Sequence, residues 1–259
     1  MSQPPESPKS AKTVTACLIV IGNEILSGRT KDANLQFLAL HLNEIGVRLM
    51  EARVIPDVEA TIIATVNECR AKFDYVITTG GIGPTHDDIT ADCVAKAFGV
   101  ALPEHPEAVA RLERHYGDPA LFTPARRRMA RIPEGGILID NPVSVAPGFQ
   151  IGNVFVLAGV PMIVEAMFKS FQHRLVGGKP MLSRTVRINL PEGTIAEPLR
   201  GLQERYSDLE IGSYPAFRMG KISTGLVLRG TEAQRLDVAA NELAEILRKL
   251  GGEPELLAS

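Results

Sequence analysis

The chain has 259 residues, of which 45% are hydrophobic, and its formal net charge is −2. This length allows one large domain or two small ones, and it suffices for a full apolar core without disulfides or structural metals. The near-neutral charge provides no general positive field, so we expect no nucleic-acid partner. No stretch of sequence approaches the roughly 20 apolar residues of a membrane-spanning helix, so we expect no membrane partner either.

The N-terminal segment and the cysteines indicate the compartment. Residues 1–12 are rich in Ser, Pro and Lys and lack the apolar core of a signal peptide, which predicts a disordered tail on a cytoplasmic protein. Cys17, Cys69 and Cys93 are far apart and do not have metal-ligand spacing. Each lies among apolar residues, so we expect three buried thiols in a reducing environment.

Strands alternate with helices in the first hundred residues. The first strand is a nearly continuous apolar run, which is typical of a strand buried on both faces. The expected strands span residues 13–21, 47–55 and 73–79, and the expected helices span 35–45, 57–69 and 89–98. This order predicts an α/β fold, a three-layer sandwich with a mostly parallel sheet and helices on both faces.

The remaining elements predict the end of this domain and a second one. Further expected elements are a polar helical stretch at 104–131, a short strand at 137–139 in a segment rich in Pro and Gly, a strand at 154–157 and a helix at 161–171. Gly177-Gly178-Lys179-Pro180 breaks the pattern. We therefore expect an α/β domain over residues 13–178 and a small α+β domain, in the order β-α-β-β-α, over 179–259.

The strongest chemical signal is Gly80-Gly81-Ile82-Gly83, which directly follows the third strand. Glycines let the backbone approach a ligand closely, and the next helix offers free N–H groups to an anion. Ligands of open α/β sheets bind at the carboxyl ends of strands, where this loop lies. It is neither a G-x-G-x-x-G motif nor a P-loop. We predict a phosphate-binding loop; the alternative is a tight turn without a ligand.

Carboxylates follow two of the predicted strands. Asp87 and Asp88 lie beside the glycine loop, and two carboxylates near a bound anion indicate a bridging cation. Asp57 follows the second strand and can face the same crevice. The sequence thus predicts a divalent-metal site formed by Asp57, Asp87 and Asp88, with Asp57 and Asp88 as catalytic candidates. The alternative role of Asp57 and of Asp88 is that of a helix N-cap.

Two groups of polar residues have ordinary explanations. Arg126, Arg127, Arg128 and Arg131 cluster on a predicted helix, and this pattern favours a solvated face over a phosphate clamp. His86 lies inside the glycine loop, but no His or Cys accompanies it as a metal-binding partner, so we do not expect it to be catalytic.

Four segments occur in an order that indicates a family. They are Gly22-Asn23-Glu24-Ile25-Leu26-Ser27-Gly28 with Asn34, Thr78 to Asp88 with Thr90, Asn141-Pro142-Val143-Ser144-Val145-Ala146-Pro147-Gly148, and Gly159-Val160-Pro161. Over about residues 13–175 the chain resembles the N-terminal domain of the competence/damage-inducible protein A (CinA) family. It is similar, more distantly, to the molybdopterin-binding proteins of molybdenum-cofactor synthesis. The second unit, with Gly212-Ser213-Tyr214-Pro215, resembles the appendage that follows this domain in CinA-like chains.

The resemblance implies a pocket for a pterin or an adenine-containing pyrophosphate. In the cofactor-synthesis relatives two aspartates handle the ligand, and they match Asp57 and Asp88. CinA domains, like the related domain of eukaryotic FAD synthases, are associated with metal-dependent hydrolysis of ADP-ribose-type pyrophosphates. The residues expected to bind the ligand are Gly22, Glu24, Ser27, Gly28, Asn34, Gly80, Gly81, Gly83, Pro84, Thr85, Thr90, Pro147, Gly148 and Pro161.

These observations leave three functions open. The first is a pyrophosphatase that acts on ADP-ribose or a related nucleotide and depends on Mg²⁺, Mn²⁺ or Co²⁺. The second is a non-catalytic module that binds molybdopterin or a nucleotide, and the third is an oligomeric scaffold; a homo-oligomer is expected in any case. Ile82 replaces a Thr of the cofactor-synthesis proteins, which favours a nucleotide over a pterin. Long CinA proteins add a nicotinamide-mononucleotide deamidase domain, an activity that we do not expect in a chain ending at Ser259.

Overall fold

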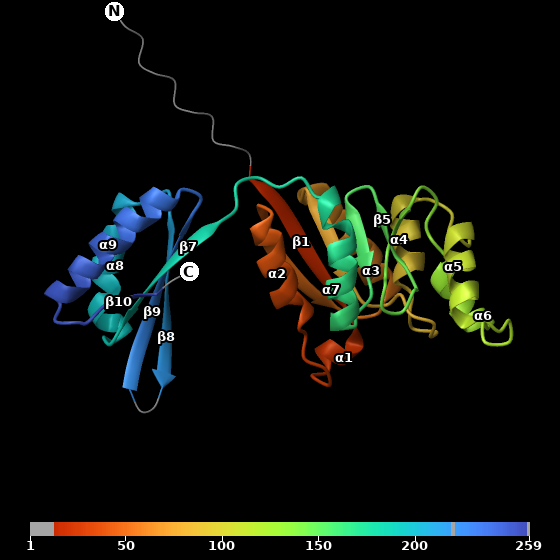
Figure 1. Cartoon of the computed structure of the whole chain (residues 1–259), viewed down its shortest axis with the longest axis horizontal. Coiled ribbons are helices and arrows are strands. Elements are labelled where there is room, and N and C mark those ends of the chain that lie inside the picture. Colours follow the sequence, from red (N-terminus) through yellow and green to blue (C-terminus); the bar gives the residue numbers. More distant parts are fainter. Residues whose placement is uncertain (1–12, 219–220, 258–259) are drawn as a thin grey trace, which may run out of the picture. The chain divides into compact units, whose positions relative to one another are not determined.

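The computed structural model describes residues 13–218 and 221–257. Contacts divide the chain into two compact units, Met1–Gly178 and Lys179–Ser259, and each has its own sheet and core (Figure 1). The predicted disordered tail, residues 1–12, lies outside the described residues.

The first unit is built on a six-stranded sheet with the order β2-β1-β3-β6-β5-β4. Its strands are β1 (Val14–Ile21), β2 (Val47–Ile55), β3 (Tyr75–Thr79), β4 (Ile137–Ile139), β5 (Gly148–Ile151) and β6 (Val154–Leu157). The pairs β1–β2, β1–β3 and β3–β6 are parallel, whereas β4–β5 and β5–β6 are antiparallel. The predicted mostly parallel sheet is confirmed, and its four parallel strands bring their carboxyl ends to one edge.

Helices cover both faces of this sheet, as predicted (Figure 1). They are α1 (Asn23–Leu26), α2 (Asn34–Glu44), α3 (Glu59–Lys72), α4 (Thr90–Phe98), α5 (Pro106–Tyr116), α6 (Pro124–Arg127) and α7 (Pro161–Phe171), with short 3₁₀ turns η1 (Arg128–Ala130) and η2 (Gln172–Arg174). The helices α3, α4 and α5 pack on one face, and α2 and α7 pack on the other. None of the helices in the described ranges is both long and apolar enough to span a bilayer.

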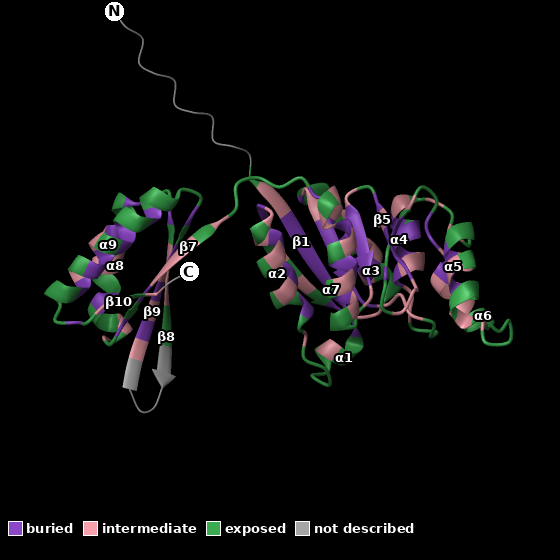
Figure 2. Ribbon diagram, viewed as in Figure 1, coloured by how far each residue is buried: buried purple, intermediate pink, exposed green. Residues whose placement is uncertain are grey.

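The first strand explains why two cores form. Ile19 and Ile21 belong to the core under α3 and α4, while Leu18 and Val20 belong to the core under α2 and α7. Because side chains alternate between the faces of a strand, an uninterrupted apolar run must be buried on both sides. Buried residues accordingly concentrate on the strands and on the inward faces of the helices (Figure 2).

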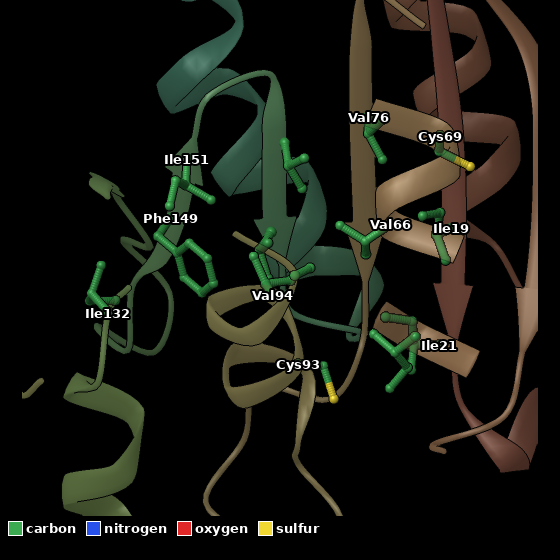
Figure 3. Packing of buried hydrophobic residues seen from close by; sticks show 14 of the residues in the cluster. Ile19, Ile21, Val66, Cys69, Val76, Cys93, Val94, Ile132, Phe149 and Ile151 are labelled. Atoms are coloured by element: carbon green, nitrogen blue, oxygen red, sulfur yellow. The ribbon is translucent and has the colours of Figure 1, made fainter. Parts of the chain in front are cut away.

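The three cysteines are free and buried, as predicted. Cys69 and Cys93 lie among aliphatic side chains of the first core (Figure 3). Cys17 Sγ lies 3.5 Å from Cys69 Sγ. Burial raises the pKa of the Cys93 thiol to about 11 and raises the pKa of Cys17 and Cys69 as well. These thiols are therefore protonated packing groups rather than nucleophiles.

Two segments of the first unit differ from the prediction. Residues 148–151 form a strand, β5, that the Pro/Gly-rich composition did not indicate; a side chain at Gly148 would place its Cβ 2.4 Å from the carbonyl oxygen of Val156 in β6. The stretch at 104–131 is not one helical region, because α5 ends at Gly117 and only the short α6 and η1 follow.

The second unit is an antiparallel sheet with two helices, and this part of the predicted fold is confirmed. Its elements are β7 (Leu182–Ile188), α8 (Glu192–Arg205), β8 (Glu210–Arg218), β9 (Lys221–Gly230), α9 (Ala233–Lys249) and β10 (Glu255–Leu257). The strand order is β10-β7-β9-β8, and side chains from α8 and α9 share one core with the sheet. The strand β10 was not predicted, because Glu255-Leu256-Leu257 lacks the β-branched residues that mark the equally short β4.

We expect residues 13–178 to fold when produced alone, because both cores of the first unit are made by residues of that unit. The fragment should unfold in one cooperative thermal transition. Its midpoint should differ from that of the same unit in the full chain by less than about 4 °C, the shift that ~1 kcal/mol produces in a domain of this size. Aggregation, or a transition without cooperativity by circular dichroism, would contradict this expectation.

Candidate functional site

Loops from several strands line one pocket at the carboxyl edge of the first sheet. Its volume is about 500 Å³, which is in the range of small-molecule sites. It is lined by Glu24, Thr30, Gly80, Gly81, Ile82, Gly83, Pro84, Asp88, Met129, Asn141, Ser144, Ala146, Ala158, Gly159, Val160, Pro161 and Ile163. The glycine loop after β3 thus faces the loops that follow β1 and β6, as the parallel topology requires.

The first two glycines of the loop are required by its geometry. Gly80 and Gly81 have φ angles of 103° and 68°, which side chains other than hydrogen rarely allow. A Cβ on Gly80 would lie 2.1 Å from the carbonyl oxygen of Ile21, at the end of the neighbouring strand β1. A Cβ on Gly81 would lie 2.2 Å from Thr90 Oγ1. After β3, the chain therefore passes closely between the end of β1 and the start of α4.

Thr90, the first residue of α4, holds this loop through two hydrogen bonds. It is fully buried, its amide donates to the Gly81 carbonyl oxygen at 2.9 Å, and its hydroxyl donates to the Gly80 carbonyl oxygen at 3.0 Å. Thr90 does not line the pocket. Its place is consistent with a role in holding the loop rather than in touching a ligand.

The glycine loop presents free donors to the pocket. Within residues 13–218 and 221–257, no acceptor pairs with the backbone amides of Gly81, Ile82 or Gly83. All three residues line the pocket. Successive unpaired amides at a strand-to-helix turn can form a concave anion site, and phosphate binding by this loop stays a prediction.

The two carboxylates beside the loop converge on one hydroxyl. Thr85 Oγ1 lies 2.5 Å from Asp87 Oδ1 and 2.5 Å from Asp88 Oδ2, and the Thr85 amide donates to Asp88 Oδ2 at 2.8 Å. The hydrogen bond from Thr85 lowers the pKa of Asp87. Asp88 lines the pocket and Asp87 does not. Asp88 is not an N-cap, because α4 begins after Ile89 and has no side-chain cap.

Asp57 lies at the carboxyl end of β2, as predicted, but it is not among the residues that line the pocket. Its Oδ2 accepts a hydrogen bond of 2.8 Å from the amide of Asn23, which ties the end of β2 to the loop after β1. It does not cap α3, whose N-cap is Val58, and it does not line the pocket. In the part of the chain that the structure describes, no three His, Cys, Asp or Glu residues group as metal ligands. The predicted set of Asp57, Asp87 and Asp88 is therefore not brought together.

The segment after β1 contributes two residues to the pocket, Glu24 and Thr30. Gly22 lies against it, since a Cβ there would be 2.5 Å from Glu24 Oε1. Ser27 donates to the Glu24 carbonyl oxygen at 3.2 Å, and Gly28 has a φ of 72° in open space. Asn34 Nδ2 donates to the Gly159 carbonyl oxygen at 2.9 Å, while its buried Oδ1 has no partner among the described residues. Apart from Glu24 and Thr30, these residues shape the pocket from outside.

The arginine cluster is not the solvated face that its pattern favoured. Arg128 donates to the carbonyl oxygens of Thr85 and Asp88, at 3.2 Å each, and thereby holds the segment that carries the carboxylates. Arg131 makes a two-pronged contact with Asp92 at 3.0 and 2.7 Å. His86, by contrast, has a side chain that is 98% exposed.

The turn at 141–147 forms part of the pocket wall, and only its last residue, Pro147, was predicted to bind the ligand. Pro84 and Pro161 line the pocket as expected, but the predicted Pro147 instead lines a separate cavity of about 10 Å³, and Gly148 begins β5. Asn141 and Ser144 line the pocket and were not singled out. The Asn141-Pro142 pair is a turn signal that could have indicated them.

Comparison with known families identifies the fold. A family model described as "Probable molybdopterin binding domain" matches residues 17–177, and one described as "FAD synthase, middle domain" matches residues 180–251. The chain belongs to the molybdopterin-binding domain family. The resemblance seen in the four sequence segments is thereby confirmed.

Individual proteins and one solved structure are also similar to this chain. A protein from Archaeoglobus fulgidus is 32% identical over 89% of this chain and 96% of its own length. A "Probable FAD synthase" from Caenorhabditis elegans is 30% identical, and the match covers 93% of this chain but 51% of that protein. The solved structure of the protein CinA from Thermoplasma acidophilum is similar with a TM-score of 0.59 and 35% identity, over 63% of this chain and 99% of that one.

The substitution Gly81→Ala should destabilise the first unit more than Gly28→Ala. Both residues have a left-handed φ, but a Cβ at Gly28 meets nothing within 4 Å, whereas one at Gly81 meets the buried Thr90 hydroxyl. We expect a loss of about 1–2 kcal/mol at Gly28 from conformation alone. At Gly81 the clash should add roughly 1–3 kcal/mol. Urea unfolding of both variants measures the difference, and equal losses would show that the loop relaxes freely.

Proposed function

We propose that the pocket binds a nucleotide that contains a pyrophosphate, such as ADP-ribose, and hydrolyses its pyrophosphate with the help of a divalent metal ion. The observation that carries this proposal is the row of unpaired amides at Gly81, Ile82 and Gly83 directly beside the carboxylate of Asp88. The amides suit phosphate oxygens, and the carboxylate suits the cation that accompanies them.

Two observations support a nucleotide rather than a pterin. Ile82 provides an apolar side chain on the pocket wall, and a polar pterin group buried against it would lose a hydrogen bond worth roughly 1–3 kcal/mol. The second unit matches the middle domain of FAD synthase, and FAD is itself an adenine-containing pyrophosphate. At ~1.4 kcal/mol per tenfold in affinity, the lost hydrogen bond alone corresponds to a preference of about tenfold to hundredfold.

The residues present fit a metal that arrives with the ligand. The described residues contain no group of three ligands that could hold an ion unaided, but Mg²⁺ is commonly held by one or two carboxylates together with substrate phosphates. Asp88 is the carboxylate on the wall beside the phosphate loop, and Asp87 adjoins it through Thr85. The metal, Mg²⁺, Mn²⁺ or Co²⁺, would neutralise phosphate charge and favour formation of hydroxide from water.

Within this proposal the other residues bind and orient the ligand. The glycine loop fixes one phosphate, and Arg128 keeps the backbone of Thr85 and Asp88 in place. Glu24 lies on the wall formed by the loop after β1, where its carboxylate can accept a hydrogen bond from a ligand hydroxyl.

A homo-oligomer and a cytoplasmic location remain predictions from the sequence. The alternative is a binding module without turnover, which turnover and binding measurements distinguish.

Exchanging Asp88 for asparagine should abolish turnover while exchanging Asp57 should not. With ADP-ribose and Mn²⁺ we expect Asp88→Asn to lower the release of AMP by about 100-fold or more, because the carboxylate that would hold the metal beside the phosphate is lost. Asp57→Asn should keep turnover within a few-fold, because Asp57 contacts Asn23 outside the pocket. Full activity of Asp88→Asn would refute its catalytic role. Binding without turnover in the wild-type protein would establish the non-catalytic module.

Metal binding should depend on the nucleotide. Calorimetric titration with Mn²⁺ should give no measurable heat for the protein alone and a saturable isotherm in the presence of a non-hydrolysable ADP-ribose analogue. A nucleotide at ~100 times its dissociation constant should also stabilise the fold by about 2.7 kcal/mol. Tight binding of Mn²⁺ to the protein alone would contradict a site completed by the ligand.

A further inference from the structure

The turn between β4 and β5 has an unusual backbone. Val145 is the one residue other than glycine with a positive φ in the described ranges, and its φ is 65°. A β-branched side chain disfavours this conformation, so surrounding contacts must hold it. The turn also adjoins the glycine loop, because Pro147 and Gly83 line the same small cavity. Residues of this turn therefore lie near the place of a bound phosphate.

Asn141 supplies the contacts that hold the turn. It is 5% exposed, and its Oδ1 accepts from the amides of Val143 and Ser144 at 3.1 Å each. Its Nδ2 donates to the Ala146 carbonyl oxygen at 2.8 Å and to Ser144 Oγ at 2.6 Å. Backbone donors face Oδ1 and a backbone acceptor faces Nδ2, so the orientation of the amide group is determined.

The hydroxyl of Ser144 is left with its hydrogen free. Ser144 Oγ accepts from Asn141, and no acceptor among the described residues receives its own hydrogen. Ser144 lines the pocket. Asn141 also lines it, but both of its amide hydrogens and both acceptor positions of its oxygen are occupied. On the wall formed by this turn, Ser144 is thus the side chain that can still donate a hydrogen bond.

We propose that Ser144 contacts the ligand as a specificity-determining residue and donates its hydroxyl hydrogen to a phosphate oxygen. Asn141 is a positioning residue, because its Nδ2 occupies a lone pair of Ser144 Oγ and so directs the hydroxyl hydrogen away from the turn. This inference rests on the proposed binding of a pyrophosphate in the pocket. Together with the amides of Gly81, Ile82 and Gly83, it places donors to phosphate on two separate loops.

A double-mutant cycle on the full chain tests the coupling. Affinity for the non-hydrolysable ADP-ribose analogue is measured by calorimetry in the presence of Mn²⁺, so that hydrolysis does not intervene. Ser144→Ala should weaken binding about tenfold, the size of one lost net hydrogen bond. Asn141→Asp should weaken it similarly, because the new carboxylate oxygen accepts the Ser144 hydrogen and withdraws it from the ligand. In the Ser144→Ala background, Asn141→Asp should cost clearly less affinity than in the wild type, because only the repulsion between the new carboxylate and the anionic ligand remains.

Control variants separate this role from a structural one. Ser144→Thr keeps the hydroxyl and should retain most of the affinity. Ser170→Ala removes a hydroxyl that donates to the Asp140 and Met167 carbonyl oxygens outside the pocket, and it should leave affinity unchanged. Thermal unfolding of each variant records the stability cost of Asn141→Asp. This cost should be the same in the wild-type and the Ser144→Ala backgrounds, because it arises from the backbone contacts.

Each outcome decides one of the two proposals. Unchanged affinity of Ser144→Ala, with normal binding by the wild type, overturns the role of Ser144 and leaves the proposed function intact. Additive losses in the cycle overturn the positioning role of Asn141. If the wild type does not bind ADP-ribose, the proposed function fails, and the same cycle is run with inorganic pyrophosphate. A pyrophosphate affinity insensitive to Ser144→Ala, or no binding of pyrophosphate, then overturns this inference as well.

Discussion

The close approach of two backbones is the constraint on which the site depends. Strands β1 and β3 are adjacent and parallel, so the chain leaving β3 must pass the last carbonyl of β1 before it turns into α4. At Gly80 there is space for a hydrogen and not for a Cβ. Thr90 then closes the turn with two hydrogen bonds to Gly80 and Gly81, and the following residues Ile82 and Gly83 line the pocket without partners for their amides among the described residues. The shape of the glycine loop is thus a consequence of strand pairing.

Much of the fold could be predicted because its signals are local. The apolar run of β1 and the glycine after α2 lie in short windows, and the alternation of strands and helices restricts the topology to few choices. Strands β5 and β10 were missed, although the equally short β6 and β4 were predicted, because glycine, glutamine or glutamate interrupts their apolar residues; their conformation is imposed by pairing with β6 and β7. Gly148 contributes to β5 through close packing, which no period reveals.

The site was predictable as a location but not in its individual contacts. Topology alone places Asp57 and Asp88 at the same sheet edge, and this placement made both candidates for the metal. Asp88 lines the pocket, whereas the carboxylate of Asp57 accepts a hydrogen bond from the Asn23 amide and does not line it. Topology alone could not show this difference. Asn141 was overlooked because it is far from the glycine loop in sequence; its importance lies in four hydrogen bonds within a turn, and composition does not show them.

The charges of the pocket link the proposed ligand to the proposed metal. An anionic ligand beside Asp88 and Glu24 is repelled by both carboxylates, and the three amides of the glycine loop carry only partial positive charge. The guanidinium of Arg128 is already occupied by two backbone carbonyl oxygens. Under the proposed function, a cation would offset the charge of the pyrophosphate. The described residues contain no group of three metal ligands, so phosphate oxygens of the ligand would complete the coordination of that cation.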